Sequence, residues 1–169
     1  MIIKSVLLSA VLVAQVARPQ VPGVSNFAKV GATIACAGAV TPAGVAEVKK
    51  LGYASIINLR EAGEAGADVE AEMAAAKSAG LIYVHLPFNG AAPDSAIVDQ
   101  FLQVVTERAN QPVLVHCASG NRAAALWMIK RLVVDGWDED RAAREASDLG
   151  LTSASLKVFV LDYATSHRR

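Results

Sequence analysis

The sequence predicts an α/β fold in which a mostly parallel central sheet of about four to five strands is flanked by helices. Two observations lead to this prediction. Short apolar runs rich in β-branched residues alternate with longer segments of helical composition. The chain has 169 residues, of which 53% are hydrophobic and 19% charged, which suits one domain with a substantial core and excludes a disordered protein.

The first half of the domain is predicted to contain two strands and the helix between them. Residues 33–37 form a short apolar strand, and Thr41 then caps a helix with Pro42 at its first position. Gly52 ends that helix, and the β-branched run 54–59 forms the next strand.

The second half continues the alternation. The segment 68–79, rich in Ala and Glu, predicts a helix, and 81–86 predicts a strand. The apolar residues of segment 94–105 recur at helical spacing, and the apolar run 113–116 predicts a buried strand. Further helices are expected over 121–134, 139–148 and 153–167. Because helices separate the strands, the sheet should be largely parallel and should bind a ligand at the carboxyl ends of its strands.

The N-terminus has the composition of a targeting segment. A single charge at Lys4 precedes the apolar run 5–14, and Ala17 is followed by turn-forming residues. This order predicts a secretory signal peptide over 1–17, a linker over 18–26 and the domain over 27–169, with export to the periplasm or the exterior. A buried N-terminal helix or an uncleaved anchor are the alternatives. The run is too short to span a bilayer comfortably, so we expect no membrane span in the mature form.

The charge balance and the cysteine count direct attention to a small local site. The 16 Lys and Arg residues equal the 16 Asp and Glu residues, so no global field favours nucleic acid or an anionic membrane as a partner. Two cysteines are too few for a disulfide framework or a four-thiolate zinc site.

The chemistry is expected in the loop after the buried strand 113–116. That strand ends at His116, and Cys117 is followed by Gly120 and Arg122 just before a helix. Backbone N–H groups of such a loop can converge on an anion, and the helix dipole and the guanidinium add positive potential. We therefore expect Cys117 to favour its thiolate form and to act as a nucleophile rather than as a small buried residue. The expected oxyanion-binding residues are Ala118, Ser119, Gly120, Asn121 and Arg122.

This segment resembles the His-Cys-x-x-Gly-x-x-Arg signature of the dual-specificity and tyrosine phosphatase superfamily. The segments Ser55–Glu61 and Leu81–Pro87 resemble the order of elements in the same superfamily. More narrowly, Cys117–Arg122 is similar to the shorter Cys-x-Ser-Gly-x-Arg loop of the bacterial beta-lactamase hydrolase-like protein, phosphatase-like domain. The resemblance covers about residues 24–150.

The resemblance implies a cysteine phosphatase-like fold and a phosphatase that acts through a cysteinyl-phosphate. Cys117 would attack phosphorus, while Arg122 and the loop N–H groups would hold the oxygens. The substrate would be a phosphorylated small molecule or protein. We expect no metal and no other cofactor, since the loop supplies the positive potential, and we expect His116 to orient the loop by a hydrogen bond.

The sequence departs from the phosphatase pattern in three ways. Arg122 lies five positions after Cys117, where the superfamily signature has six. Ala123 replaces the Ser or Thr that often follows the arginine. Asn89 stands where the general acid is expected, and Asp94 is the nearest carboxylate, either as the acid or, more in keeping with its position, as a helix cap.

These departures leave two other functions open. One is a rhodanese-like sulfurtransferase that carries a persulfide on Cys117, and the other is a non-catalytic oxyanion-binding domain. Two further features also remain open. Cys36 is either a core residue or a disulfide partner of Cys117. The segment 60–64, with Arg60, Glu61 and Glu64, either shapes the pocket or is a solvated loop.

Overall fold

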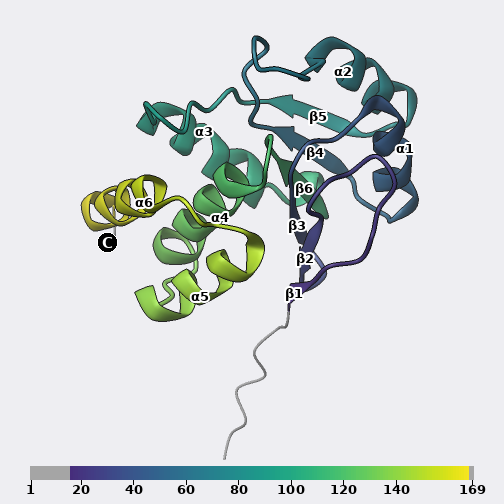
Figure 1. Ribbon diagram of the computed structural model, residues 1–169. Coiled ribbons are helices and arrows are strands. Elements are labelled where there is room, and N and C mark those ends of the chain that lie inside the picture. Colours follow the sequence, from purple (N-terminus) through teal and green to yellow (C-terminus); the bar gives the residue numbers. More distant parts are fainter. Residues whose placement is uncertain (1–15, 168–169) are drawn as a thin grey trace, which may run out of the picture.

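The computed structural model describes residues 16–167 and shows one six-stranded sheet with helices on both faces (Figure 1). The strands lie in the order β1-β2-β3-β6-β4-β5, and the pairs β3–β6, β6–β4 and β4–β5 are parallel. The strands are β1 (Val16–Ala17), β2 (Ala28–Val30), β3 (Ile34–Ala37), β4 (Ser55–Asn58), β5 (Ile82–His85) and β6 (Val113–His116). The helices are α1 (Pro42–Lys50), α2 (Val69–Ser78), α3 (Ser95–Thr106), α4 (Asn121–Val133), α5 (Glu139–Leu149) and α6 (Ala154–His167), with a 3-10 turn at Arg108–Asn110.

The predicted α/β class is confirmed, and so are the four predicted strands. The sheet is larger than expected because β1 and β2 add two short antiparallel strands at one edge. Each has at most three residues, and an alternation of apolar and polar residues over so few positions cannot identify a strand.

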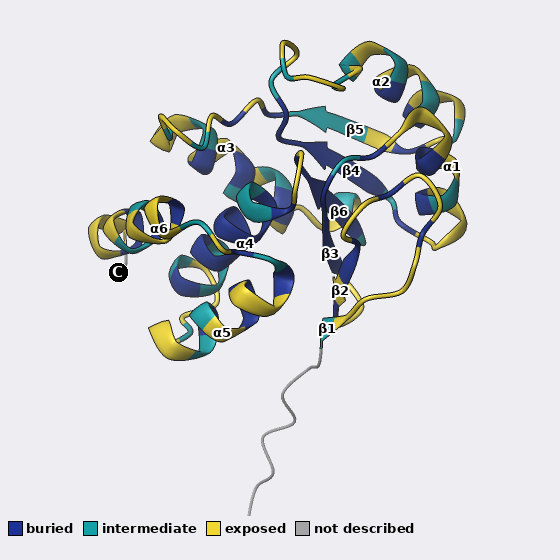
Figure 2. Ribbon diagram, viewed as in Figure 1, coloured by how far each residue is buried: buried dark blue, intermediate teal, exposed yellow. Residues whose placement is uncertain are grey.

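The helices cover the two faces unequally. On one face α1 and α2 pack over a smaller apolar cluster that includes Val45, Ile56 and Leu114. On the other, α4 lies against β3 and β6 and is itself covered by α5 and α6. Seven consecutive residues of α4, 123–129, and then Leu132 are almost without exposed surface, and Figure 2 shows this helix as buried as the central strands. This buried helix fixes the loop that precedes it.

Residues 18–26, expected as a linker, lie against the folded body. Val21 and Val24 are buried in the smaller cluster, and the Arg18 guanidinium donates a hydrogen bond to the carbonyl of Asp148. Ala17, the expected end of the signal peptide, pairs with Lys29 in the β1–β2 ladder. The apolar run 5–14 lies outside the described residues, so the signal peptide and export stay predictions. Within residues 16–167, no helix combines the length and the apolar character needed to cross a membrane.

Candidate active site

The cysteine loop lies at the centre of the sheet's carboxyl edge. His116 at the end of β6 is in register with Ala37 of β3 on one side and with Asn58 of β4 on the other. The backbone N–H of Cys117 donates to the Ala37 carbonyl at 3.3 Å, and the Leu59 N–H donates to the His116 carbonyl at 2.9 Å. Both neighbouring strands therefore fix the point where the chain leaves the sheet and enters the loop.

The Cys117 sulfur accepts a hydrogen bond from the backbone of its own loop. The Gly120 N–H donates a hydrogen bond to Sγ at 3.1 Å, and Gly120 is the N-terminal cap of α4. Its φ of 103° lies in the left-handed region, which a residue without a Cβ adopts at little cost. Since the first N–H groups of a helix have no partner within the helix, the sulfur faces donors and the positive end of the α4 dipole. Cys117 is only 1% exposed, so this field acts with little screening by water.

Arg122, in the first turn of α4, is held by the carboxylate of Glu64. The distances are 2.5 Å from Nη1 to Oε1 and 2.8 Å from Nη2 to Oε2. Nη1 also donates to the carbonyls of Leu59 at 3.2 Å and Phe88 at 3.0 Å. A guanidinium has five N–H groups in a rigid fork, so these contacts use the Nη1–Nη2 edge and leave the Nε–Nη2 edge for an oxyanion.

The Glu64–Arg122 pair is ionised across the working pH range. The hydrogen bond from Arg122 is the main cause that lowers the Glu64 pKa from 4.5 to about 2, against a smaller opposing effect of burial. The same hydrogen bond raises the already high pKa of Arg122, while burial lowers it, and a thiolate at Cys117 raises it further through its charge and a hydrogen bond. The guanidinium is thus coupled to the nucleophile as well as to Glu64.

Arg60 shapes the turn that presents Glu64. Its guanidinium donates to the Gly66 carbonyl at 2.9 Å, to the Ala65 carbonyl at 2.7 Å and to Glu64 Oε2 at 3.3 Å. The side chain is only 5% exposed. The segment 60–64 therefore shapes the site, which is one of its two expected roles, and is not a solvated loop, which is the other.

His116 lies beneath the loop, next to a buried carboxylate that the sequence analysis missed. Its Nε2 is 2.7 Å from Glu72 Oε1, within ion-pair distance. Among the described residues neither ring nitrogen has a hydrogen-bond partner, so the expected hydrogen bond by which His116 would orient the loop is not observed. The other oxygen of Glu72 accepts a hydrogen bond from Asn58 Nδ2 at 3.3 Å, and this amide nitrogen also donates to Tyr83 Oη at 2.8 Å. One feature of the sequence could have pointed to Glu72: it is an acidic residue on the buried face of α2, which it shares with Ala76.

The outer side of the loop is tied to neighbouring segments. Asn26 Nδ2 donates to the Ser119 carbonyl at 3.1 Å, and the Ala39 N–H donates to the Ala118 carbonyl at 3.0 Å. The Asn121 side-chain oxygen accepts hydrogen bonds from the backbone N–H groups of Thr152 at 2.7 Å and Ser153 at 2.9 Å. These contacts hold the carbonyls of Ala118 and Ser119 and the side chain of Asn121 in place from outside the loop.

Asp94, the candidate acid, and Asn89, which occupies the position where the acid is expected, both accept hydrogen bonds from nearby backbone N–H groups. Asp94 is exposed, and its Oδ1 accepts a hydrogen bond from the Ala96 N–H at 2.8 Å, which confirms the predicted helix cap. Asn89 Oδ1 accepts hydrogen bonds from the N–H groups of Ala91 and Ala92 at 2.8 and 3.2 Å, and its amide cannot act as an acid. A catalytic role for Asp94 stays a prediction.

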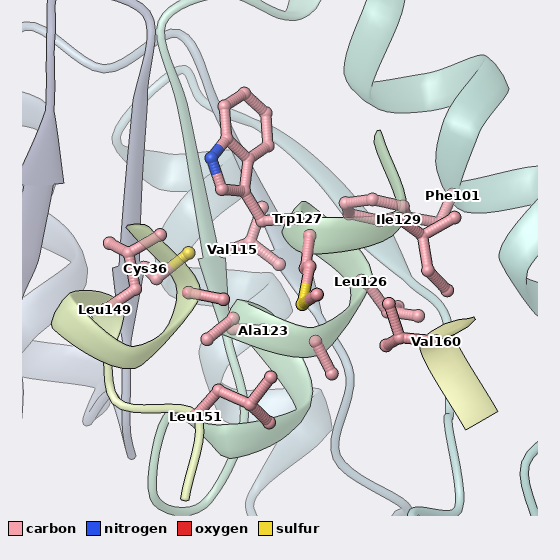
Figure 3. Close-up of a cluster of buried hydrophobic side chains, with 14 of the residues drawn as sticks. Cys36, Phe101, Val115, Ala123, Leu126, Trp127, Ile129, Leu149, Leu151 and Val160 are labelled. Atoms are coloured by element: carbon pink, nitrogen blue, oxygen red, sulfur yellow. The ribbon is translucent and has the colours of Figure 1, made fainter. Parts of the chain in front are cut away.

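Cys36 belongs to the core and is a free thiol, as is Cys117. Cys36 is opposite Val115 in the β3–β6 ladder. Cys117 comes two residues after Val115, just beyond the end of β6. Figure 3 shows Cys36 among apolar side chains that include Val115, Leu149 and Leu151. Burial raises the pKa of the Cys36 thiol well above its usual range, which favours the core role over the alternative, a disulfide with Cys117.

The solved structures that resemble the chain have the fold of cysteine-based phosphatases. A DUF442 protein of Shewanella putrefaciens CN-32 superposes with a TM-score of 0.75 at 19% identity, covering 87% of this chain and 96% of that chain. TpbA of P. aeruginosa gives 0.67 at 22% identity and covers 90% of both chains. The catalytic core of the PP-IP phosphatase SIW14 of S. cerevisiae gives 0.67 at 20% identity, covering 87% of both. At these identities the likeness establishes the fold alone.

Sequence comparisons identify the family through a family model that matches residues 26–133. The beta-lactamase hydrolase-like proteins of two strains of Xylella fastidiosa are 41% identical over 87 residues, which cover 50% of this chain and 20% of each relative. The aligned part therefore spans about a fifth of those relatives. The family model for the beta-lactamase hydrolase-like protein, phosphatase-like domain matches residues 26–133, which include Glu64, Cys117 and Arg122 and make up more than half of the chain. The chain belongs to this family of phosphatase-like domains.

Proposed function

We propose that the protein is a cysteine-dependent phosphatase that hydrolyses phosphoric monoesters through a cysteinyl-phosphate. The Cys117 thiolate attacks phosphorus, a sulfur–phosphorus bond forms, and the ester oxygen leaves with its electron pair. Water then attacks the same phosphorus, releases inorganic phosphate and restores the thiolate. The free edge of Arg122 and the N–H groups around Gly120 stabilise the equatorial oxygens in both steps.

The observation that carries this proposal is the place of the Cys117 sulfur. It accepts the Gly120 N–H at 3.1 Å at the start of α4, beside a guanidinium whose other edge is held by Glu64. Family membership and the fold that the chain shares with TpbA and SIW14 support the same reaction. A TpbA variant has been crystallised with phosphotyrosine, and SIW14 is a PP-IP phosphatase, so the substrates of these proteins are phosphorylated compounds.

The residue at position 89 predicts which esters react. An amide there supplies no proton, so the departing oxygen must leave as an anion unless Asp94 moves in to protonate it. Aryl phosphates with acidic phenols should therefore react much faster than alkyl phosphates.

The test compares p-nitrophenyl phosphate with phenyl phosphate and an alkyl phosphate, using the parent protein and Cys117→Ser. Turnover of the nitrophenyl ester that disappears in Cys117→Ser supports the mechanism, and equal turnover in both proteins contradicts it. Asp94→Asn is the second variant, because Asn keeps the helix cap and removes the acid. A loss confined to phenyl and alkyl phosphates would identify Asp94 as the acid, while unchanged rates assign it to the cap alone.

The lack of an acid at Asn89 and the short loop also favour a second candidate, sulfur transfer. The Cys117 thiolate would attack the outer sulfur of thiosulfate, form a persulfide and expel sulfite, which leaves with the electrons of the broken sulfur–sulfur bond and needs no proton. A thiol acceptor would then take the outer sulfur. Mass spectrometry of the protein after incubation with thiosulfate separates the two proposals, because a gain of one sulfur on Cys117 supports transfer and an unmodified Cys117 rejects it.

A further inference from the structure

The segments around the anion loop hold few cationic side chains. Five segments touch the loop or Arg122 through the contacts given above or through packing, as Leu156 does against Gly90 beside the Arg122 side chain. These wall segments are residues 24–26, 38–39, 59–64, 88–90 and 152–156. Their charged residues are Arg60, Glu61 and Glu64, all from the same segment.

The charges of the loop and its wall segments cancel. Arg60 and Arg122 give two positive charges, and Glu61 and Glu64 give two negative charges, so the sum is zero before Cys117 ionises. Both arginines are engaged with Glu64. After these contacts, the loop's positive potential comes from its backbone N–H groups and from the Nε–Nη2 edge of Arg122. This potential suits a single phosphoryl group.

Glu61 is the partly exposed charge at the rim. Its Oε1 is 3.5 Å from Asn89 Nδ2, where the segments 59–64 and 88–90 meet beside Arg122. Its backbone N–H donates to Glu64 Oε1 at 2.8 Å, which fixes the position of the residue. An anionic group extending from the loop over this rim meets a carboxylate rather than a cation.

The wider edge repeats this pattern. The N-terminal ends of α2 and α3, which follow strands at this edge, carry Asp68, Glu70 and Asp94. The lysines of α1 and α2 occupy the last turns of these helices, at the opposite end. Interaction with the helix dipoles is sufficient reason for this arrangement, but the resulting field acts on any approaching anion.

Two cations outside the wall segments lie beside them. Lys157 lines a cavity of about 260 Å³ with Ala143 and Ser147 of α5 and with residues 152–154 of a wall segment. Arg18 lines another cavity with residues 24–26 and donates a hydrogen bond to the Asp148 carbonyl. Neither side chain has a contact with the loop among those that the structure gives for the described residues.

We infer that the site takes one small phosphoryl group on a neutral or basic carrier and rejects polyphosphorylated ligands, with Glu61 as the determinant at the rim. This inference rests on the proposed function, since it concerns the ligand of the same loop. A dianionic monoester places its charge inside the loop, whereas further phosphates of a polyphosphate must lie over the acidic rim. The repulsion is between partly solvated charges, so salt weakens it.

The experiment measures binding of orthophosphate and of inorganic tripolyphosphate to the full-length Cys117→Ser protein by calorimetry. We expect a Kd for tripolyphosphate at least about tenfold higher than for orthophosphate at low salt, and a smaller ratio when ionic strength rises from about 0.02 to about 0.3 M. Glu61→Gln should reduce the ratio, and Glu61→Lys should reduce it further or invert it. Asp140→Asn is the matched control, because it makes the same charge change as Glu61→Gln on the exposed first turn of α5. The ratio of the two Kd values in this control should equal the ratio measured with Glu61 unchanged.

Tripolyphosphate binding as tight as orthophosphate, or a ratio that Glu61→Lys leaves unchanged in a folded protein, overturns the inference. Thermal unfolding of each variant checks the fold, and Glu61→Gln carries the test if Glu61→Lys fails to fold. The proposed function is judged separately, by Cys117-dependent turnover of the nitrophenyl ester. Absence of that turnover with a preserved preference for orthophosphate would remove the phosphatase and leave the anion selectivity.

Discussion

Glu64 and Arg122 form a two-pronged ion pair at 2.5 and 2.8 Å across 58 positions of sequence. The pair joins the turn after β4 to the first turn of α4, and it fixes which edge of the guanidinium faces the cysteine. Glu64 is thus a positioning residue for an oxyanion that it does not itself touch.

Glu64→Gln should lower kcat/KM for p-nitrophenyl phosphate by about 10- to 100-fold, because an uncharged amide holds Arg122 less firmly and a displaced guanidinium stabilises the transition state poorly. Steady-state kinetics at neutral pH measure the change. Glu139→Gln makes the same change at an exposed position of α5 and should leave the rate unaltered. Parent-like kinetics in Glu64→Gln would show that Arg122 does not need this partner.

The same pair should make stability depend on pH in the acid range. The Glu64 pKa is about 2 in the folded protein against an ordinary 4.5. Because the folded value is the lower one, ionisation stabilises the folded state above pH 4.5, and this contribution is lost as the pH falls toward 2. Urea unfolding of the parent and Glu64→Gln should therefore show a difference in unfolding free energy that is constant near neutral pH and shrinks below about pH 4.5. A difference that does not depend on pH would refute the assignment.

Removal of the carboxylate beneath the loop should destabilise the protein. Glu72→Ala removes the carboxylate beside the buried His116 and one of the two acceptors of the Asn58 amide nitrogen, and we expect a loss of about 3 kcal/mol in the free energy of unfolding. Glu72→Gln keeps an acceptor oxygen and should cost about 1 kcal/mol. Urea denaturation measures both, with Glu70→Ala as the exposed control two positions away. Equal stability of Glu72→Ala and the control would show that the buried pair contributes little.

A Cβ at the cap of α4 should damage both the fold and the site. Gly120 has φ of 103°, and Gly52, at the end of α1, has φ of 88° with no atom near its added Cβ. Gly120→Ala and Gly52→Ala should each cost about 1–2 kcal/mol. Only Gly120→Ala should also weaken phosphate binding, because the N–H that faces Cys117 would move. If both variants bind phosphate like the parent, the left-handed cap is not required for the site.

The sequence pattern was sufficient for the alternating elements and for the cysteine loop. Each depends on local signals, such as Thr41 and Pro42 at the start of α1 or the apolar run that ends at His116. It was insufficient for Glu64 and Glu72, because their roles arise from side chains brought together by the sheet order. In that order β6 lies between β3 and β4, and no local pattern specifies which turn then lies beside Arg122. The edge strands β1 and β2 were missed for a different reason, since runs of two and three residues carry no periodicity.

The hydrogen bonds from Thr152 and Ser153 to Asn121 have a consequence for how much chain the chemistry requires. The family model ends at residue 133, at the last residue of α4, yet the brace on the cysteine loop comes from the two residues that precede α6. A version shortened to the matched region would keep Cys117, Arg122 and Glu64 and would lose that brace, together with the cover over α4. Transplanting this centre into another scaffold therefore means carrying the two C-terminal helices along with it.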